Sequence, residues 1–419
     1  MTGGPGRAPI PDIDAAGIDL LDPLLHRDYD LSALWQRLRR QAPVRWQAAG
    51  PQGPGFWVLT RHRDVAATYR DFRRFSSGQG NMLETLLRGG DPAGGQMLVV
   101  TDGRHHASLR RLMHGGFGHR ALGIIGDCVR QATADVLQVA LERGECNFVQ
   151  DVASVVPLVA ICELLAVPTV DRPEILHLTR SAMGSGPEAQ RSMQARVAQS
   201  EILMYYYQLA MERRRAPGTD VVSLLANGVV EGRPLTDEEV VANCYNLIVG
   251  GNETTRLSMA SGLLALIEHE SEWARLSRGE VEVSTAADEI LRWTTPVIHV
   301  GRTATTDVTI SGTTIRAGDI VTLWNASANR DEEVFERPDQ LILDRSPNHH
   351  LALGFGSHYC LGGYLATMEL RALLELLQGE VASVALNGPV EWLSSNFVNG
   401  VESLPVRLRP TVRTRFPRA

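Results

Sequence analysis

The sequence predicts a large globular fold that contains long helices, and three observations support this prediction. The chain has 419 residues, of which 44% are hydrophobic, so it can bury a large core. A segment with apolar periodicity starts near the acidic sequence LTDEE and runs to about Leu266. A second apolar helix is expected after the glycine-rich sequence LGFGSHYCLGGYLA, which begins at Leu353. Length alone would suggest two or three domains.

The segment TDGRHHASLRRL, residues 101–112, places a histidine and an arginine on one helix face. His106 and Arg110 are four residues apart, and side chains at that spacing are neighbours on a helix. Both residue types donate hydrogen bonds to carboxylates. A basic helix face is also the usual pattern of a solvated surface, so the spacing alone leaves both interpretations open.

The long periodic segment contains LIVGGNETTR, residues 247–256, which is unusual for a buried helix. Glycine costs about 1 kcal/mol relative to alanine inside a helix, so Gly250 and Gly251 indicate a requirement other than stability. An alternative interpretation is that NETT caps a helix at a break. The sequence EILR then places Glu289 and Arg292 one helical turn apart, where the two charges can pair. Taken alone, such a pair is common on solvated helices.

The sequence LGFGSHYCLGGYLA presents one cysteine, Cys360, in a loop of glycines. The glycines permit positive φ and a close approach of the backbone to a large planar ligand. The start of the following helix offers free N–H groups to a thiolate, which is the form of cysteine that binds metals. His358 could donate a hydrogen bond to an anionic group of the ligand. The alternative is a buried, inert cysteine beside a glycine turn.

In this order, the motifs resemble those of the cytochrome P450 family. The cysteine loop resembles the haem-binding pattern Phe-x-x-Gly-x-x-x-Cys-x-Gly, with Gly356, Cys360 and Gly362 in register. Leu353 departs from the pattern, because the family usually has phenylalanine there. The resemblance implies that this position packs near the sulfur, so the substitution alters the redox potential without removing the ligand. It covers nearly the whole chain, from WVLTRHRDV near Trp57 to SNFVNGVESLPVRL near the end.

The resemblance implies a mostly α fold with small β-sheets, the cytochrome P450 fold. Residues 1–419 would form a single domain with a flexible N-terminus over residues 1–20. Haem b would lie buried between the oxygen-binding helix and the cysteine loop, with the thiolate of Cys360 as axial ligand to the iron. Glu253 and Thr254 match the pair that delivers protons, although Gly250 replaces the more frequent alanine.

Further site residues follow from the resemblance alone. The family's structural Glu-Arg-Arg network would consist of Glu289, Arg292 and Arg345. Contacts to the haem, including its propionates, would come from His106, Arg110, Gly251, Arg302, Phe355, His358, Cys360 and Gly362. The substrate pocket would be lined by Asn81, Met82, Leu83, Leu86, Asn246, Val249, Gly250, Val297, Ile298, Asn396 and Phe397. Asn81, Asn246, His299 and Asn396 are the polar candidates for orienting a substrate.

Composition and charge limit the classes of binding partner and the cellular compartment. A net charge of -7 indicates neither a nucleic-acid surface nor binding to an anionic membrane. No stretch of eighteen apolar residues and no signal-peptide pattern are found, and the cysteines lack disulfide-framework spacing, so we expect a cytoplasmic protein. The resemblance implies electron delivery by a ferredoxin and a ferredoxin reductase. The docking site would include the basic stretch formed by His105, His106, Arg110, Arg111, His114, His119 and Arg120.

The predicted function is that of a haem-thiolate monooxygenase. It would use O₂ to hydroxylate or epoxidise a small organic substrate, an intermediate of natural-product (secondary metabolite) biosynthesis. One alternative keeps the haem but forms C–C or C–N bonds without inserting oxygen. A second is a haem-containing binding protein without turnover. A third, a structural metal site built from His349, His350, His358 and Cys360, lacks the paired ligand spacing of zinc sites.

Overall fold

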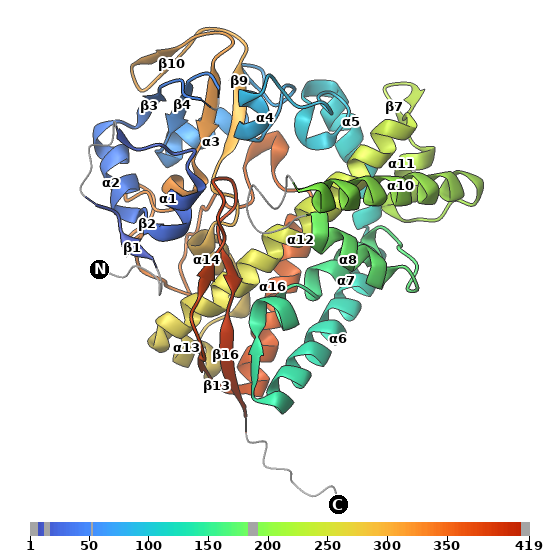
Figure 1. Cartoon of the computed structure of the whole chain (residues 1–419), viewed down its shortest axis with the longest axis vertical. Helices are drawn as coiled ribbons and strands as arrows, with labels where there is room; N and C mark the ends of the chain where they lie inside the picture. Colours follow the sequence, from blue (N-terminus) through green and yellow to red (C-terminus); the bar gives the residue numbers. More distant parts are fainter. Residues whose placement is uncertain (1–6, 12–16, 52, 183–191, 412–419) are drawn as a thin grey trace, which may run out of the picture.

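The architecture of the computed structural model is mostly helical, with several small sheets (Figure 1). The structure describes residues 7–11, 17–51, 53–182 and 192–411. Within the N-terminus predicted to be flexible, residues 1–6 and 12–16 lie outside these ranges. The predicted fold class, mostly α with small β-sheets, is confirmed.

The helices range from one turn to almost nine turns in length. Those before the central helix are α1 (Pro23–Asp28), α2 (Ser32–Gln41), α3 (His62–Arg70), α4 (Leu83–Leu87), α5 (Gly103–His114), α6 (His119–Arg143), α7 (Val156–Leu164), α8 (Arg172–Ala182), α10 (Met193–Arg215) and α11 (Val221–Asn227). The central helix and those after it are α12 (Asp237–Glu268), α13 (Glu270–Ser277), α14 (Val283–Thr294), α15 (Asn325–Ala328) and α16 (Gly363–Glu380).

The largest sheet has five strands in the order β3-β4-β12-β9-β5, with β12 parallel to β4 and antiparallel to β9. Its strands are β3 (Val44–Gln47), β4 (Phe56–Leu59), β5 (Phe75–Ser76), β9 (Val300–Ala304) and β12 (Ile320–Leu323). A three-stranded sheet joins β6 (Glu145–Asn147), β13 (Val381–Leu386) and β16 (Pro405–Pro410). Two-stranded ribbons are formed by β1 (Ala8–Pro9) with β2 (Tyr29–Asp30), β7 (Val229–Val230) with β8 (Arg233–Pro234), β10 (Val308–Ile310) with β11 (Thr313–Ile315), and β14 (Glu391–Trp392) with β15 (Val401–Ser403).

Helix α12 is the axis of the molecule. It begins with a capping box, in which the Thr236 hydroxyl accepts a hydrogen bond from the Glu239 N–H and the Glu239 carboxylate accepts one from the Thr236 N–H. The helix has 32 residues, which corresponds to a length of about 48 Å. It crosses the centre of the molecule and packs against α7, α10, α14 and α16 (Figure 1). The predicted segment, LTDEE to about Leu266, therefore matches the observed helix closely.

Candidate functional site

The cysteine loop is held open by two glycines and one backbone hydrogen bond. Gly354 and Gly356 both have φ of 70°, a conformation that favours glycine. A Cβ atom on Gly356 would lie 2.9 Å from the carbonyl oxygen of Tyr69, so no side chain fits there. The Cys360 N–H donates to the Leu353 carbonyl at 2.8 Å, and α16 begins three residues after the cysteine. The local sequence thus fixes the direction of the Cys360 side chain.

Cys360 lines a cavity that is also lined by residues of helix α12. The cavity has about 830 Å³ of empty volume, including open solvent at its mouth. Its lining is largely apolar, with a few polar side chains. The lining residues are Leu98, Val99, His106, Arg110, Phe117, Ile161, Leu164, Asn246, Leu247, Gly250, Gly251, Thr254, Thr255, His358, Tyr359, Cys360, Leu361, Gly362, Leu365, Ala366 and Glu369.

The electrostatic setting of the thiol combines opposing effects. Burial raises the pKa of the Cys360 thiol, whereas a hydrogen bond from the Gly362 backbone and the positive charge of Arg110 lower it. A bound metal cation would displace the thiol proton, because thiolate is the ligating form. Burial is also the largest cause that raises the pKa of the Cys162 thiol and that of the Cys244 thiol, and neither residue lines this cavity. Cys360 is therefore the cysteine placed for metal ligation.

The glycines of α12 differ in their surroundings. A Cβ atom on Gly250 would meet no atom within 4 Å, so this position leaves open space beside the cavity. A Cβ atom on Gly251 would lie 3.1 Å from Cδ1 of Ile161 on α7. Thr254 lines the cavity one turn later, and its hydroxyl donates to the Gly250 carbonyl at 2.8 Å. Glu253 pairs with Arg256 and is not part of the lining.

His106, Arg110 and His358 gather at one side of the cavity, as the spacing of the first two predicts. The rings of His106 and His358 lie 4.2 Å apart, centroid to centroid. Nε2 of His358 contacts Oδ1 of Asp102 at 3.0 Å, and Asp102 also accepts hydrogen bonds from Ser76 and Ser77. His358 therefore already has an anionic partner within the protein.

This basic group can accept an anion. Burial lowers the pKa of His106 to about 4, and the positive charges of His358 and Arg110 act in the same direction. Nε2 of His106 is buried and has no hydrogen-bond partner. Burial also lowers the pKa of the Arg110 guanidinium. A carboxylate placed here would satisfy the His106 nitrogen and the charge of Arg110.

Arg302 occupies a different position. It lies on β9, it is buried, and its Nη1 donates to the Gly301 carbonyl at 2.7 Å. Its guanidinium lies 5.6 Å from the centroid of the Tyr69 ring. Arg302 does not line the cavity wall described above. Phe355 is also outside that lining, and the guanidinium of Arg70 covers its ring at 4.5 Å.

The three members of the predicted Glu-Arg-Arg network are brought together beneath the cysteine loop. Arg292 binds Glu289 through two hydrogen bonds of 2.7 and 2.8 Å, and both side chains are completely buried. Nε of Arg345 reaches the same carboxylate at 3.0 Å. Arg292 also donates to the backbone carbonyls of Asn329 and Pro338. The buried carboxylate and both cations are thus paired, as burial requires.

The predicted substrate residues separate into three groups. Asn246 and Gly250 line the cavity, whereas Leu83, Leu86 and Ile298 belong to a hydrophobic core cluster near the N-terminus. The remaining predicted residues, Asn81, Met82, Val249, Val297, Asn396 and Phe397, are not part of the cavity lining.

Two of the polar candidates are already engaged elsewhere. The amide of Asn396 donates to the Leu21 carbonyl at 2.8 Å. His299 is buried and stacks on Trp324, with ring centroids 4.4 Å apart. Asn246 is left as the polar candidate that lines the cavity.

Sequence reasoning missed several residues of the site. Asp102 lies inside the quoted motif and directly precedes α5, where a cap would be expected, but its carboxylate binds His358 instead. Ile161, Phe117 and Glu369 line the cavity from other segments, and no local pattern distinguishes them from core residues. Burial raises the pKa of Glu369 well above its usual value, and its Oε2 has no partner.

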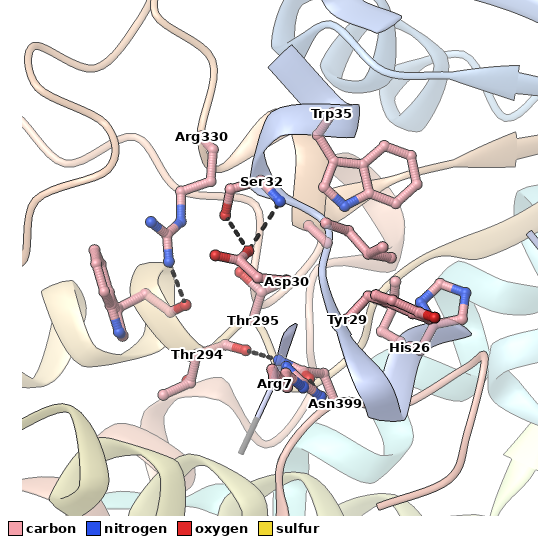
Figure 2. Close-up of a pocket in the computed structure, with 14 residues that line it drawn as sticks. Arg7, His26, Tyr29, Asp30, Ser32, Trp35, Thr294, Thr295, Arg330 and Asn399 are labelled. Atoms are coloured by element: carbon pink, nitrogen blue, oxygen red, sulfur yellow. Dashed lines mark hydrogen bonds between the residues drawn. The ribbon is translucent and has the colours of Figure 1, made fainter. Parts of the chain in front are cut away.

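A second, smaller cavity lies between the N-terminal segment and the end of α14 (Figure 2). Figure 2 shows Asp30 accepting hydrogen bonds from the backbone and hydroxyl of Ser32, at 3.0 and 2.7 Å. In the same view Arg7 and Asn399 lie together, and Nη2 of Arg7 donates to Oδ1 of Asn399 at 2.8 Å. The lining of this cavity is polar and contains no cysteine. Residues from near both ends of the chain, Arg7 and Asn399, meet in it.

No group of three or more His, Cys, Asp or Glu side chains in the described ranges could hold a metal ion. Within the same ranges, no helix is long and apolar enough to cross a membrane.

The chain is similar in sequence and in structure to known proteins. The family model described as Cytochrome P450 matches residues 283–378. The chain is 45% identical over 391 residues to cytochrome P450 NovI of Streptomyces niveus, covering 93% of this chain and 96% of that protein. It is 31% identical over 397 residues to a steroid C26-monooxygenase of Mycobacterium bovis, covering 92% and 91%. The crystal structure of P450 OxyD, involved in the biosynthesis of vancomycin-type antibiotics, superimposes with a TM-score of 0.87 at 34% identity, covering 94% and 100%.

Proposed function

The chain belongs to the cytochrome P450 family, and from that premise we propose that it hydroxylates or epoxidises an intermediate of natural-product biosynthesis. The family assignment makes it a monooxygenase that uses haem, O₂, a small-molecule substrate and redox partners. The observation that carries the proposal is that Cys360 lines a largely apolar cavity together with Gly250, Gly251 and Thr254 of α12. P450 OxyD, which is named for antibiotic biosynthesis, is 34% identical to the chain, compared with 31% for the steroid C26-monooxygenase, and this supports the proposed substrate class.

The residues of the cavity fit haem b. The thiolate of Cys360 would hold the iron, and Gly250 of α12, where a Cβ atom would meet nothing within 4 Å, leaves room for a flat ring in the cavity. His106 and Arg110 would bind a propionate, because the His106 nitrogen is buried without a partner. A haem held by a thiolate supplies oxidative chemistry by favouring cleavage of the O–O bond. We also propose contacts from Gly251, Arg302, Phe355, His358 and Gly362.

The protein's own contribution is to admit protons and exclude bulk water. The overall reaction converts RH, O₂, two electrons and two protons into ROH and water. Thr254 lines the cavity and carries a hydroxyl, and Glu253 is the acid next to it in the sequence. We propose these two residues as the route by which both protons enter. The apolar lining holds the substrate and keeps other water away.

We further propose the surroundings in which this enzyme works. A ferredoxin with its reductase would supply the electrons, docking at the basic stretch around α5 that carries Arg110 and Arg111. The protein would act in the cytoplasm. Residues 1–419 would form one domain, with Glu289, Arg292 and Arg345 holding the segment below the haem.

The first experiment tests the cofactor and its ligand. The reduced protein should bind carbon monoxide with the strongly red-shifted absorption of a thiolate-ligated haem. Cys360→Ala should abolish that absorption, whereas Cys162→Ala, a buried cysteine away from the cavity, should retain it. Protein that purifies without haem, or an unchanged spectrum in Cys360→Ala, would contradict the proposal.

The second experiment tests the substrate class. A panel of antibiotic precursors and steroids is screened for displacement of the iron-bound water, seen as a change of spin state, and hits are incubated with ferredoxin, reductase and NADPH. Mass spectrometry under labelled O₂ should find a product that gains one labelled oxygen atom. A product that lacks two hydrogens and carries no label would identify C–C or C–N bond formation instead. Binding without any product would indicate a haem-containing binding protein.

A further inference from the structure

Glu253 and Arg256 form a two-point ion pair within α12. Nε of Arg256 donates to one carboxylate oxygen at 2.9 Å, and Nη2 donates to the other at 2.5 Å. The side chains are only 11% (Arg256) and 15% (Glu253) exposed. A paired carboxylate with both oxygens bonded in this way has a fixed plane and direction. The pair therefore decides where the acid of the proposed proton route points.

That direction is not toward the cavity. Asn246, Gly250 and Thr254 are spaced four residues apart on α12, and all three line the cavity, whereas Glu253 does not. The Thr254 hydroxyl donates to the carbonyl of its own helix instead of contacting the carboxylate. For Glu253 to reach Thr254, it must turn away from Arg256.

A second carboxylate, that of Glu402, lies close to Arg256. Oε2 of Glu402, on β15, lies 3.8 Å from Nη2 of Arg256. This strand is packed directly on α12, because a Cβ atom on Gly400 would lie 2.6 Å from Cδ2 of Leu257. The Val401 N–H also donates to the hydroxyl of Ser261 on α12 at 3.3 Å. The backbone thus keeps Glu402 in place relative to the guanidinium.

We infer that Arg256 is a positioning residue that holds Glu253 away from the cavity, and that Glu402 takes over the guanidinium when Glu253 turns inward. The inference rests on the proposed role of Glu253 and Thr254 in proton entry. Without Glu402, the turn of Glu253 would leave a nearly buried cation unpaired, which is costly. With Glu402, the guanidinium remains paired in both positions of Glu253. β15 therefore contributes a residue to the proton route.

The test needs no organic substrate, because O₂ itself can be reduced to two products. One NADPH, one proton and O₂ give NADP⁺ and hydrogen peroxide, whereas two NADPH, two protons and O₂ give two NADP⁺ and two waters. Restricted proton entry favours peroxide. A ferredoxin and its reductase supply the electrons to the holoenzyme, and peroxide is measured per NADPH consumed.

We expect Glu402→Gln to raise the peroxide fraction about threefold or more, because Arg256 then lacks its second carboxylate when Glu253 turns inward. Arg256→Gln releases Glu253 and should lower the fraction, whereas Arg256→Lys should stay near the wild-type value. In the double variant the effect of Glu402→Gln should disappear, because both residues act through one guanidinium. The matched control is Arg275→Gln. Arg275 likewise bridges a glutamate three residues earlier, Glu272, and a carboxylate from another segment, Asp344, away from the cavity.

A second readout is independent of turnover. The infrared difference between the wild-type resting enzyme and its Glu253→Gln variant isolates the carboxylate band of Glu253. The same difference in an Arg256→Gln background should show a shifted and broadened band, because the carboxylate loses its two-point partner. An unchanged band, together with a peroxide fraction that Arg256→Gln does not lower and Glu402→Gln does not raise, would overturn the inference. If Thr254→Ala still raises the peroxide fraction in that case, the proposed proton route stands and only the role of Arg256 falls.

Discussion

At the scale of single residues, the site depends on where polar atoms find partners. The Thr254 hydroxyl bonds to its own helix, and the carboxylate of Asp102 engages His358. Nε2 of His106, in contrast, is buried with no partner. Buried polar atoms in native proteins are nearly always satisfied, so the unsatisfied nitrogen beside Arg110 is where we propose that an anionic group binds.

The Thr254 hydroxyl should control how reducing equivalents are used. Thr254→Ala removes it from the cavity wall, so protons enter more slowly and the fraction of NADPH electrons recovered as peroxide should rise about threefold or more. Thr254→Ser keeps a hydroxyl and should remain near the wild-type value. Both variants should fold and bind haem normally, as checked by the carbon monoxide spectrum. An unchanged peroxide yield in Thr254→Ala would remove Thr254 from the proton route.

The sequence predicted the identity of these residues better than their orientation. The spacing of His106 and Arg110 correctly places both at the cavity. Glu253 was expected beside Thr254 in the proton route, but the structure pairs it with Arg256. A helical acid can turn toward a cavity or toward an arginine three residues later, and spacing alone does not choose between these two positions.

At the scale of elements, the two adjacent glycines of α12 lower the stability of the helix and leave space for neighbouring groups. Gly250 and Gly251 both lack a side chain, but only the second is confined by a neighbour, Ile161 on α7. The space beside Gly250 is open, and this residue lines the cavity. The family more often has alanine at this position. The two positions therefore offer a matched pair for testing what the glycines do.

Adding the same methyl group at each position should have different effects. Gly250→Ala should raise the free energy of unfolding by about 1 kcal/mol, because alanine is the better helix former and meets no atom. It should also weaken binding of the bulkiest ligands in the spin-state screen. Gly251→Ala should gain less stability or lose some, because its methyl presses on Ile161. Equal changes in urea unfolding for both variants would contradict this account.

Element boundaries were predictable where a strong local signal exists. The LTDEE sequence predicts the start of α12, and the capping box of Thr236 with Glu239 supplies the physical cause. The loop before α5 gave no such signal. Leu83 and Leu86 were expected in the substrate pocket, but they pack in the core, because an apolar pattern is the same for both destinations.

At the scale of the whole molecule, buried histidines link stability to pH. Burial lowers the pKa of His26 to about 4, that of His299 to about 3 and that of His350 to about 4. An unfolded histidine titrates near 6.5, so between about pH 4 and 6.5 the unfolded chain binds more protons than the folded one. The contribution of these histidines to the free energy of unfolding is therefore fully present above about pH 6.5 and is lost as the pH is lowered.

The contribution of one histidine can be isolated. Each buried histidine should add up to about 1.4 kcal/mol per pH unit to the slope of unfolding free energy in this range. His299→Phe keeps an aromatic ring on Trp324 and removes the titrating group. Urea unfolding at several values between about pH 5 and 7 should give a shallower slope for the variant. Identical slopes for variant and wild type would show that His299 does not contribute.

The overall architecture was predictable only through family resemblance. Length alone suggested two or three domains, and no motif indicated how the N-terminal segment meets the C-terminal strands. The contacts that define the cavity join α5, α7, α12 and the cysteine loop, which are far apart in the sequence. Local periodicity carries no information on such pairings.

The hydrogen bond between Arg7 and Asn399 connects residues 392 positions apart. Arg7 also donates to the Arg27 carbonyl, and its guanidinium lies over the ring of Trp392. A contact of such long range cannot repay its loop-closure entropy until the intervening chain is already arranged. During refolding, it should be among the last contacts to form. Protection of the Ala8 backbone amide against hydrogen exchange would then report when folding is complete, long after α12 has become protected.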